Sequence, residues 1–313
     1  MLVTALSGGV GGAKLVLGLS KLLERGELVV VGNTGDDFDL FGLHISPDLD
    51  ILMYTLAGIA DEVNGWGVKD DTFNCLVALN ENFGLEKWFN LGDKDLATHI
   101  YRTELLKGGY KLSRTTETLC SSLHANNVRI IPMTDDKVET LVKLQDGSIV
   151  HFEEYFVKRR SSEPITGVTY NGSESARPAK GVLESIARSD VIVVCPSNPI
   201  ASIGPILSIK AIRKALSNTK SPVVAVSPII GGMPLKGPAD KFMRGLGLEV
   251  SALGVAKLYM DILTHFIIDD KDAPLKEAIN SIGLSTIVTN TIMNTLEDKV
   301  RLARAILNLV QKS

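Results

Sequence analysis

The chain has 313 residues, of which 45% are hydrophobic, and a net charge of -3 at pH 7. This length allows one large or two ordinary domains, and the apolar content is enough to fill a large core. The weak negative charge and the few aromatic residues argue against nucleic-acid binding, which needs a basic surface and base-stacking side chains. No signal peptide is visible, and the apolar runs are shorter than the roughly 20 residues of a membrane-spanning helix. We therefore expect a cytoplasmic protein without membrane or nucleic-acid partners.

The three cysteines are Cys75, Cys120 and Cys195. They are far apart and odd in number, so their spacing fits neither a disulfide framework nor a metal site. We expect them to be reduced side chains in the core of a cytosolic protein.

The chain begins with a strand, a glycine-rich turn and a helix. Leu2 to Leu6 is an apolar run, and leucines recur at helical spacing from Leu15 as far as Glu24. The turn between them matches neither the dinucleotide fingerprint G-x-G-x-x-G nor the phosphate loop G-x-x-x-x-G-K-[ST]. Free N–H groups at a helix start suit a phosphate, so this turn is a candidate anion site. The alternative is a turn whose glycines only allow the helix to pack closely on the strand. The candidate residues are Gly8, Gly9, Val10, Gly11, Gly12, Ala13 and Lys14.

Carboxylates follow the second predicted strand, Leu28 to Gly32, at the end where open α/β sheets bind ligands. Asn33 lies there too, and we assign it to the phosphate site. Carboxylates beside a phosphate are what Mg²⁺ needs, and we select Asp36 and Asp50 as candidate metal ligands. The others are expected to make turns and helix caps. Asp50 starts a helix that ends near Gly58, and it is also the candidate catalytic base. The five carboxylates are Asp36, Asp37, Asp39, Asp48 and Asp50.

Residues 51–125 are predicted to be mainly helical, with a helix from Thr72 to Asn82. Trp88 and Phe89 could form the wall of a slot for a planar ring, although such residues are more often part of a core or an interface. His99 lies on a following helix that Asp93 or Asp95 would cap, and we expect it to be structural rather than catalytic.

From Val128 to Val157 the hydrophobic period changes to two, which is typical of strands. Gln145-Asp146-Gly147 has the composition of a hairpin turn between two of them. We therefore expect a small β-hairpin region here.

The second half of the chain alternates strands and helices. The helices run from Pro178 to Arg188, from Ser202 to Leu216 and from Gly237 to Gly245. The apolar strands before the second and third helices have the composition of buried parallel strands. Later segments are a helix over 255–263, a strand over 286–289 and a helix over 296–310. Polar donors after the strands are Ser197, Asn198, Ser202 and Ser227.

Three strand-to-helix loops rich in glycine or serine would thus lie at one edge of a sheet, where a nucleotide or diphosphate can bind. The pattern predicts an α/β fold, namely a Rossmann-like three-layer sandwich with a mostly parallel sheet. We expect a single domain, residues 1–313. The mainly helical insertion 51–125 would form part of an acceptor site, beside the small β-hairpin region.

Several stretches together resemble 2-phospho-L-lactate transferase, over nearly the whole chain. These stretches are Ser7–Leu15, Asn33–Asp37, Ile45–Asp50, Gly65-Trp66-Gly67 with Asp71-Thr72, Trp88–His99, Pro196–Pro199, Ser227–Gly232 and Gly237-Pro238-Ala239.

The resemblance implies transfer of a phospho-acid group from lactyl- or enolpyruvyl-diphosphoguanosine to a ribityl hydroxyl. The acceptor would be Fo, the deazaflavin 7,8-didemethyl-8-hydroxy-5-deazariboflavin, and the products coenzyme F-420-0, or its dehydro form, and GMP. The resemblance also implies Mg²⁺, a homodimer and a methanogen source.

On this basis Asp50 is the candidate base or metal ligand, and it would also contact the deazaflavin together with Trp88 and Phe89. The loop from Gly8 to Lys14 would hold the guanosine diphosphate part, with Ser197 and Asn198.

Two other classes are considered. The chain resembles more distantly the bacterial gluconeogenesis factors, which bind nucleotide sugars without known turnover. The stretches around Trp66 and Trp88 favour the transferase. A nicotinamide dehydrogenase is disfavoured because Glu27 comes too early to bind the ribose.

Overall fold

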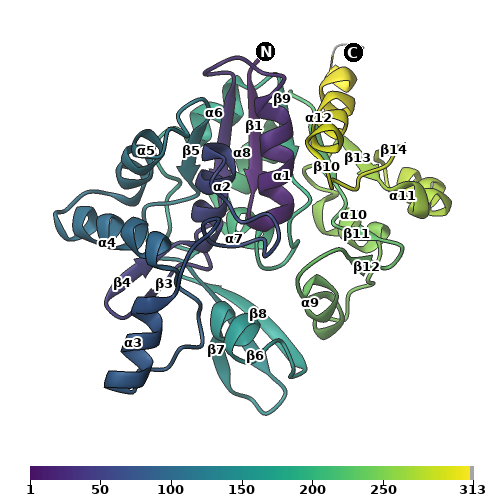
Figure 1. The fold of residues 1–313 in the computed structure, drawn as a ribbon. Helices are drawn as coiled ribbons and strands as arrows, with labels where there is room; N and C mark the ends of the chain where they lie inside the picture. Colours follow the sequence, from purple (N-terminus) through teal and green to yellow (C-terminus); the bar gives the residue numbers. More distant parts are fainter. Residues whose placement is uncertain (311–313) are drawn as a thin grey trace.

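The computed structural model describes residues 1–310, and its centre is a seven-stranded parallel sheet in the order β14-β13-β10-β9-β1-β2-β5 (Figure 1). Helices cover both faces of this sheet, so its central strands are buried along their whole length and mainly apolar. The expected α/β, Rossmann-like fold is confirmed. The strands of the sheet are β1 (Val3–Ser7), β2 (Leu28–Gly32), β5 (Arg129–Pro132), β9 (Val191–Val194), β10 (Val223–Val226), β13 (His265–Ile268) and β14 (Ser285–Val288).

The strand order reverses next to β1. The chain moves outward from β1 through β2 to β5, and it then returns to β9 on the other side of β1 before continuing through β10, β13 and β14. The direction of winding therefore reverses between β1 and β9. Open α/β sheets bind their ligands outside the carboxyl ends of the strands at this point.

The helices form two outer layers, each over its own apolar core. On one face lie α1 (Gly9–Ser20), α2 (Pro47–Ala57), α5 (Leu112–Ser122) and α12 (Leu296–Val310). On the other lie α6 (Val182–Arg188), α7 (Ile203–Ser208), α8 (Lys210–Asn218), α9 (Ala239–Gly245), α10 (Ala252–Tyr259) and α11 (Lys276–Ser281). Together with the sheet, these helices make the expected three-layer sandwich.

Further elements project beyond the carboxyl edge of the sheet, in the lower half of Figure 1. They are two hairpins, a pair of helices and a three-stranded antiparallel sheet. The hairpins are β3 (Phe38–Leu40) with β4 (Leu43–Ile45), and β11 (Ile229–Ile230) with β12 (Met233–Pro234). The helices are α3 (Asn74–Phe83) and α4 (Asp93–Lys107). The small sheet contains β6 (Glu139–Leu144), β7 (Ile149–His151) and β8 (Ile165–Asn171), with a short π-helix, Glu154–Lys158, between β7 and β8. A short 3-10 helix, Asp270–Leu275, follows β13 of the main sheet.

Several boundaries differ from the sequence predictions. Helix α1 ends at Ser20 rather than Glu24, and the helix expected to reach Leu216 is broken where Ile209 adopts an extended conformation. Strand β8 was missed because its residues are half-exposed and show no apolar alternation. The hairpin turn between β6 and β7 is confirmed.

All three cysteines are free, as expected, but only Cys120 and Cys195 are buried. The prediction was wrong for Cys75, which lies exposed on α3. This helix buries only Leu76, so its other side chains face outward.

Within residues 1–310, no helix is both long enough and apolar enough to cross a membrane.

Gly18 lets α12 pack directly on α1. A Cβ at this position would collide with the backbone carbonyl of Lys299. Because backbone atoms cannot rotate away as a side chain can, α12 would have to shift.

We predict that Gly18→Ala lowers the free energy of unfolding by about 2 kcal/mol, which is the typical cost of overpacking a core. Urea unfolding measures this difference. Gly167→Ala is the control, because a Cβ there would make only an ordinary 3.7 Å contact. Equal stability of the two variants would contradict the tight α1–α12 packing.

Candidate functional site

Loops from three strands meet at the carboxyl edge of the sheet, where the winding reverses. The N–H of Gly8 donates to the hydroxyl of Ser197 at 3.2 Å, and this hydroxyl donates to the carbonyl of Gly8 at 2.6 Å. The amide of Asn33, after β2, donates to Asp48 at 2.8 Å and to the carbonyl of Ala201 at 3.3 Å. The predicted residues Gly8, Asn33 and Ser197 thus lie together in one crevice.

The start of α1 is contacted by a carboxylate. The N–H of Gly9 donates to Asp48 at 2.6 Å, and Asp48 lies in the first turn of α2. A negative group is favourable there because the helix dipole makes this end positive. Asp48 therefore links α1 and α2, the capping role that the sequence suggested for most of the carboxylates.

Three glycines of the loop are required by packing. A Cβ at Gly8 would collide with Asp48, one at Gly11 with the carbonyl of Pro196, and one at Gly12 with Ser7. The packing interpretation of the glycine-rich turn is therefore supported. Phosphate binding by Gly8 to Ala13 stays a prediction.

Four buried carboxyl groups lie close enough to influence each other: Asp36, Asp37, Asp48 and Glu153. Burial raises the pKa of Asp48 to about 6. Burial, reinforced by repulsion from Asp48 and Asp37, raises the pKa of Glu153 to about 8. The pKa of Asp36 is raised by burial and by the charges of Asp48 and Glu153. Strongly perturbed carboxyl groups in a crevice are candidates for functional groups.

Glu153 was missed by the sequence analysis. It lies two residues after the end of β7, beside the small sheet that was expected to be only a hairpin region. Only the packing of this sheet against the loops after β2 brings Glu153 beside Asp48. Its position in the sequence, more than 100 residues from Asp48, carries no signal of this.

Asp50 points from α2 to α4. The guanidinium of Arg102, which is fully buried, binds both oxygens of Asp50. His99 lies 3.2 Å from the same guanidinium and 3.2 Å from Asp95, and its structural role stays a prediction. The structure thus places Asp50 in a buried ion pair between helices, and its role as base or metal ligand stays a prediction.

Trp88 and Phe89 come together with two side chains from other elements. The ring centroids of Phe38 and Phe89 are 5.0 Å apart, and those of Phe38 and Trp88 are 5.6 Å apart. His151, two residues before Glu153, lies 5.8 Å from Phe38. These rings are only partly buried, and Phe38 directly follows Asp37 in the chain. An apolar wall therefore lies close to the carboxyl groups.

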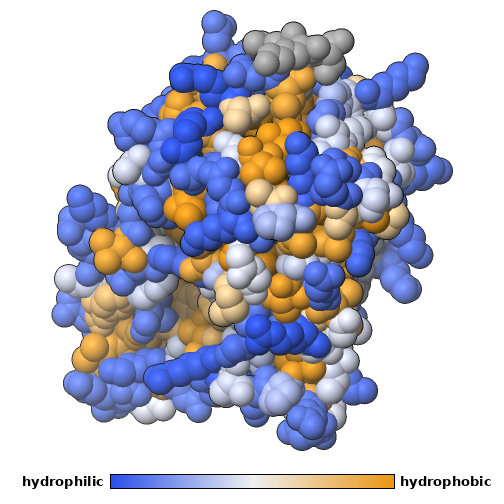
Figure 2. All heavy atoms as spheres, turned by 90° about the vertical axis from the view of Figure 1, so that its right-hand side faces the viewer, coloured by the Kyte–Doolittle hydropathy of each residue, from blue (hydrophilic) through white to orange (hydrophobic). Residues whose placement is uncertain are grey.

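The face shown in Figure 2 has a shaded hollow in its lower part, and the side chains visible inside it are apolar. A hollow of this kind is suited to a flat, apolar ligand.

Other predicted donors are used locally. The hydroxyl of Ser227 donates to the carbonyl of Ile229 at 2.8 Å, and the side-chain oxygen of Asn198 accepts from the N–H groups of Ile200 and Ala201. Lys14 donates to the carbonyl of Met293 at 3.0 Å. Their binding to a nucleotide stays a prediction.

The carboxyl cluster fits a magnesium ion that keeps water and phosphate ligands. One buried oxygen of Asp36 has no hydrogen-bond partner, and its neighbours repel it. In the part of the chain that the structure describes, no three acidic, histidine or cysteine side chains form a complete metal site. Mg²⁺ commonly binds through one or two carboxylates plus substrate phosphates, so it does not need such a site.

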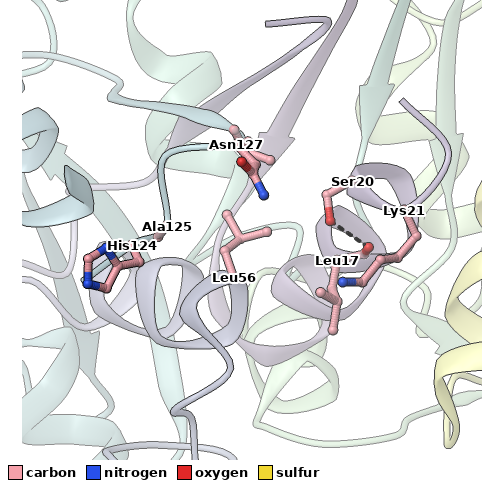
Figure 3. Close-up of a pocket in the computed structure, with 8 residues that line it drawn as sticks. Leu17, Ser20, Lys21, Leu56, His124, Ala125 and Asn127 are labelled. Carbon is pink, nitrogen blue, oxygen red and sulfur yellow. Dashed lines mark hydrogen bonds between the residues drawn. The ribbon is translucent and has the colours of Figure 1, made fainter. Parts of the chain in front are cut away.

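A separate small pocket lies at the opposite edge of the sheet. It has a volume of about 50 Å³ and is lined by residues that end α1, such as Leu17, Ser20 and Lys21, and by residues before β5, such as His124 and Asn127 (Figure 3). Binding sites for small molecules are typically about 300 Å³ or larger. This pocket is therefore too small to hold a nucleotide.

The fold and the site together define a Rossmann-type protein with buried carboxyl groups of raised pKa at the strand reversal. Comparison with known proteins gives the family. The model of 2-phospho-L-lactate transferase CofD matches residues 3–289, and the chain belongs to this family of transferases.

Relatives named phosphoenolpyruvate transferase and relatives named 2-phospho-L-lactate transferase are both similar to this chain. It is 42% identical to the phosphoenolpyruvate transferase of Streptomyces coelicolor, over 100% of this chain and 99% of the relative. It is 41% identical to the 2-phospho-L-lactate transferase of Methanocaldococcus jannaschii, over 97% of both chains. These relatives come from organisms as different as Streptomyces coelicolor and Methanocaldococcus jannaschii, so the methanogen source expected for this chain stays a prediction.

Among solved structures, a UPF0052-family protein, BH3568 from Bacillus halodurans, is similar with a TM-score of 0.67. It shares 15% sequence identity, and 98% of each chain is covered. At this identity the likeness supports the fold alone.

We predict that Glu153→Gln makes the stability of the metal-free protein less dependent on pH. Its pKa is raised from 4.5 to about 8 on folding, so between these values the folded state binds more protons than the unfolded state. Stability contributed by this group is therefore present at low pH and lost as pH rises, by at most about 1.4 kcal/mol per pH unit. Urea unfolding at pH 5, 6, 7 and 8 measures the slope. A variant as pH-dependent as the wild type would contradict the burial of this carboxyl. Glu163→Gln, at a half-exposed position, is the control.

Proposed function

We propose that this transferase moves the phospho-acid group of lactyl- or enolpyruvyl-diphosphoguanosine to the ribityl hydroxyl of Fo, giving coenzyme F-420-0, or its dehydro form, and GMP. The observation that carries the proposal is the buried carboxyl cluster of Asp36, Asp48 and Glu153 at the strand reversal. The names of the relatives support the transferred group.

The proposed step is an attack on phosphorus. The hydroxyl oxygen of the acceptor bonds to the phosphorus that carries the lactyl or enolpyruvyl group, and the bond from this phosphorus to the bridging oxygen breaks. GMP leaves with the bridging oxygen, and the hydroxyl proton passes to a carboxylate and then to water. A base with a pKa near neutrality is effective in such a transfer, and Asp48, with a pKa of about 6, meets this condition.

Mg²⁺ would be held on the side of Asp36, and it would neutralise phosphate oxygens when bound. Asp50, the other metal candidate, supports the site by a different route. Its ion pair with Arg102 anchors the first turn of α2, which also carries Asp48. Correct positioning of reacting groups is the main contribution of a protein to phosphoryl transfer.

The acceptor ring would lie against Trp88 and Phe89. These side chains and Phe38 offer a partly exposed aromatic surface beside Asp37. Offset or edge contacts with such rings favour a flat tricyclic ligand. This arrangement would bring the ribityl chain toward the carboxyl groups.

The proposal includes two alternatives for the acid group of the donor, lactyl and enolpyruvyl. The relatives named phosphoenolpyruvate transferase and 2-phospho-L-lactate transferase are almost equally similar to the chain, at 42% and 41% identity. Both names favour a transferase over a regulator of the gluconeogenesis-factor type. A homodimer is part of the proposal, and sedimentation velocity would test it.

We predict that Trp88→Ala and Phe89→Ala each raise the Kd for Fo by about tenfold, since loss of a ring contact costs roughly 1 kcal/mol or more. Deazaflavin fluorescence during titration, with GDP and Mg²⁺ present, measures the change. Phe83→Ala is the control, because this ring is 73% exposed on α3. Unchanged Fo affinity in both variants would remove the aromatic wall from the proposal. No saturable Fo binding by the wild type would remove the acceptor.

We predict opposite effects on stability for Asp36→Asn and Asp50→Asn. Asp36→Asn removes a buried carboxyl group whose ionised form is disfavoured by burial and by its acidic neighbours, so the metal-free protein becomes more stable while turnover falls at least a hundredfold. Asp50→Asn leaves Arg102 buried without its partner, which costs about 3 kcal/mol or more. Thermal unfolding and steady-state rates at several Mg²⁺ concentrations measure both effects. Near-normal turnover of Asp36→Asn would exclude it from the metal site.

A further inference from the structure

Three lysines from distant parts of the sequence gather along the first half of α1. Lys14 belongs to α1, Lys236 follows β12, and Lys299 lies in α12. The ammonium of Lys236 is 3.3 Å from where a Cβ on Gly65 would lie, and a methyl group of Val10 in α1 is 3.4 Å from the same point. Both Lys236 and Lys299 lower the pKa of Lys14 by repulsion, in addition to the larger effect of burial.

This lysine cluster has too few negative partners. Lys299, whose side chain is 3% exposed, pairs with Glu62 at 3.0 Å. Neither Lys14 nor Lys236 forms an ion pair with any residue of the described chain, 1–310, and Lys14 donates only to the carbonyl of Met293. Lys14 is partly buried, and such a cation is unfavourable unless an anion compensates it, whereas Lys236 is exposed and free to contact a ligand. A ligand with more than one negative charge would supply that compensation.

The fold holds each lysine in place by a separate close contact. Gly18 allows α12 to approach α1, which delivers Lys299. The loop that contains Gly65 has no side chain at the point nearest to Lys236, so the ammonium can approach Val10. Gly65 and Gly237 both have positive φ, a conformation that glycine adopts without strain.

We propose that Lys14, Lys236 and Lys299 form the subsite for the phosphate on the nucleotide side of the donor, the part that leaves. This inference rests on the proposed function, because it assigns one end of a nucleoside diphosphate ester to these lysines. They attract the dianionic phosphate and stabilise the charge that develops on it as the bond to the bridging oxygen breaks.

The two sides of the α1 start then orient the donor. Asp48 contacts α1 at Gly9, whereas the lysine cluster surrounds Val10 and Lys14. The nucleotide phosphate is drawn to the cationic side. The phosphorus that carries the acid group is then directed to the side of the carboxyl cluster, where the acceptor hydroxyl would be deprotonated. This separation of charge determines which of the two phosphorus atoms of the donor lies beside the acceptor hydroxyl.

The test is a set of binding titrations with GDP, GMP and guanosine, measured by calorimetry on the full chain at two salt concentrations. Lys236→Gln and Lys14→Gln are expected to raise the Kd for GDP about tenfold or more, the effect of losing one charge-assisted hydrogen bond. Guanosine binding should not change, and Lys236→Arg should restore GDP binding. Lys276→Gln, an exposed lysine on α11, is the matched control for loss of one charge.

Equal GDP affinity of wild type, Lys14→Gln and Lys236→Gln would overturn the proposal. So would an equal loss of guanosine and GDP binding, because that would indicate a general disturbance of the fold. A parallel Fo titration separates the two hypotheses. If Fo does not bind but GDP affinity depends on the lysines, the acceptor assignment fails and the phosphate subsite stands.

Discussion

The structure of the site depends on one contact, the hydrogen bond from the N–H of Gly9 to the carboxylate of Asp48. It fixes the start of α1 against the first turn of α2, and Asn33 binds the other oxygen of the same carboxylate. Through these two bonds, the loops after β1 and β2 and the helix α2 share a single group. A side chain on Gly8 would displace Asp48, so glycine at this position preserves the whole arrangement.

The charged side chains around this contact form two groups, one on each side of the start of α1. Asp36, Asp48 and Glu153 lie on one side and repel each other in a buried environment. Lys14, Lys236 and Lys299 lie on the other with one carboxylate partner, Glu62. Asp36, Asp48 and Glu153 are buried, so their mutual repulsion is unfavourable without a cation. In the proposed function, a diphosphate with a bound divalent cation would place positive charge beside the carboxyl groups and negative charge beside the lysines.

The sequence predicted the elements whose signals are local. The run from Leu2 to Lys14 specifies a strand, a turn and a helix by itself, and the apolar run before Ser197 predicts a buried parallel strand. The alternation of such strands with helices along the chain predicted the fold class. Glu153, Arg102 and Lys236 could not be found in the same way, because each acts through a partner more than 50 residues away that only tertiary packing brings near.

The prediction for Asp50 illustrates why spacing alone is insufficient. Asp48 and Asp50 are two residues apart in the first turn of α2, and the sequence analysis selected Asp50 for the site while it assigned Asp48 to a turn or helix cap. On a helix, residues two apart point to different sides. Asp48 therefore contacts α1, while Asp50 contacts Arg102 of α4. The two carboxylates therefore join α4 and the start of α1 through the same turn of α2.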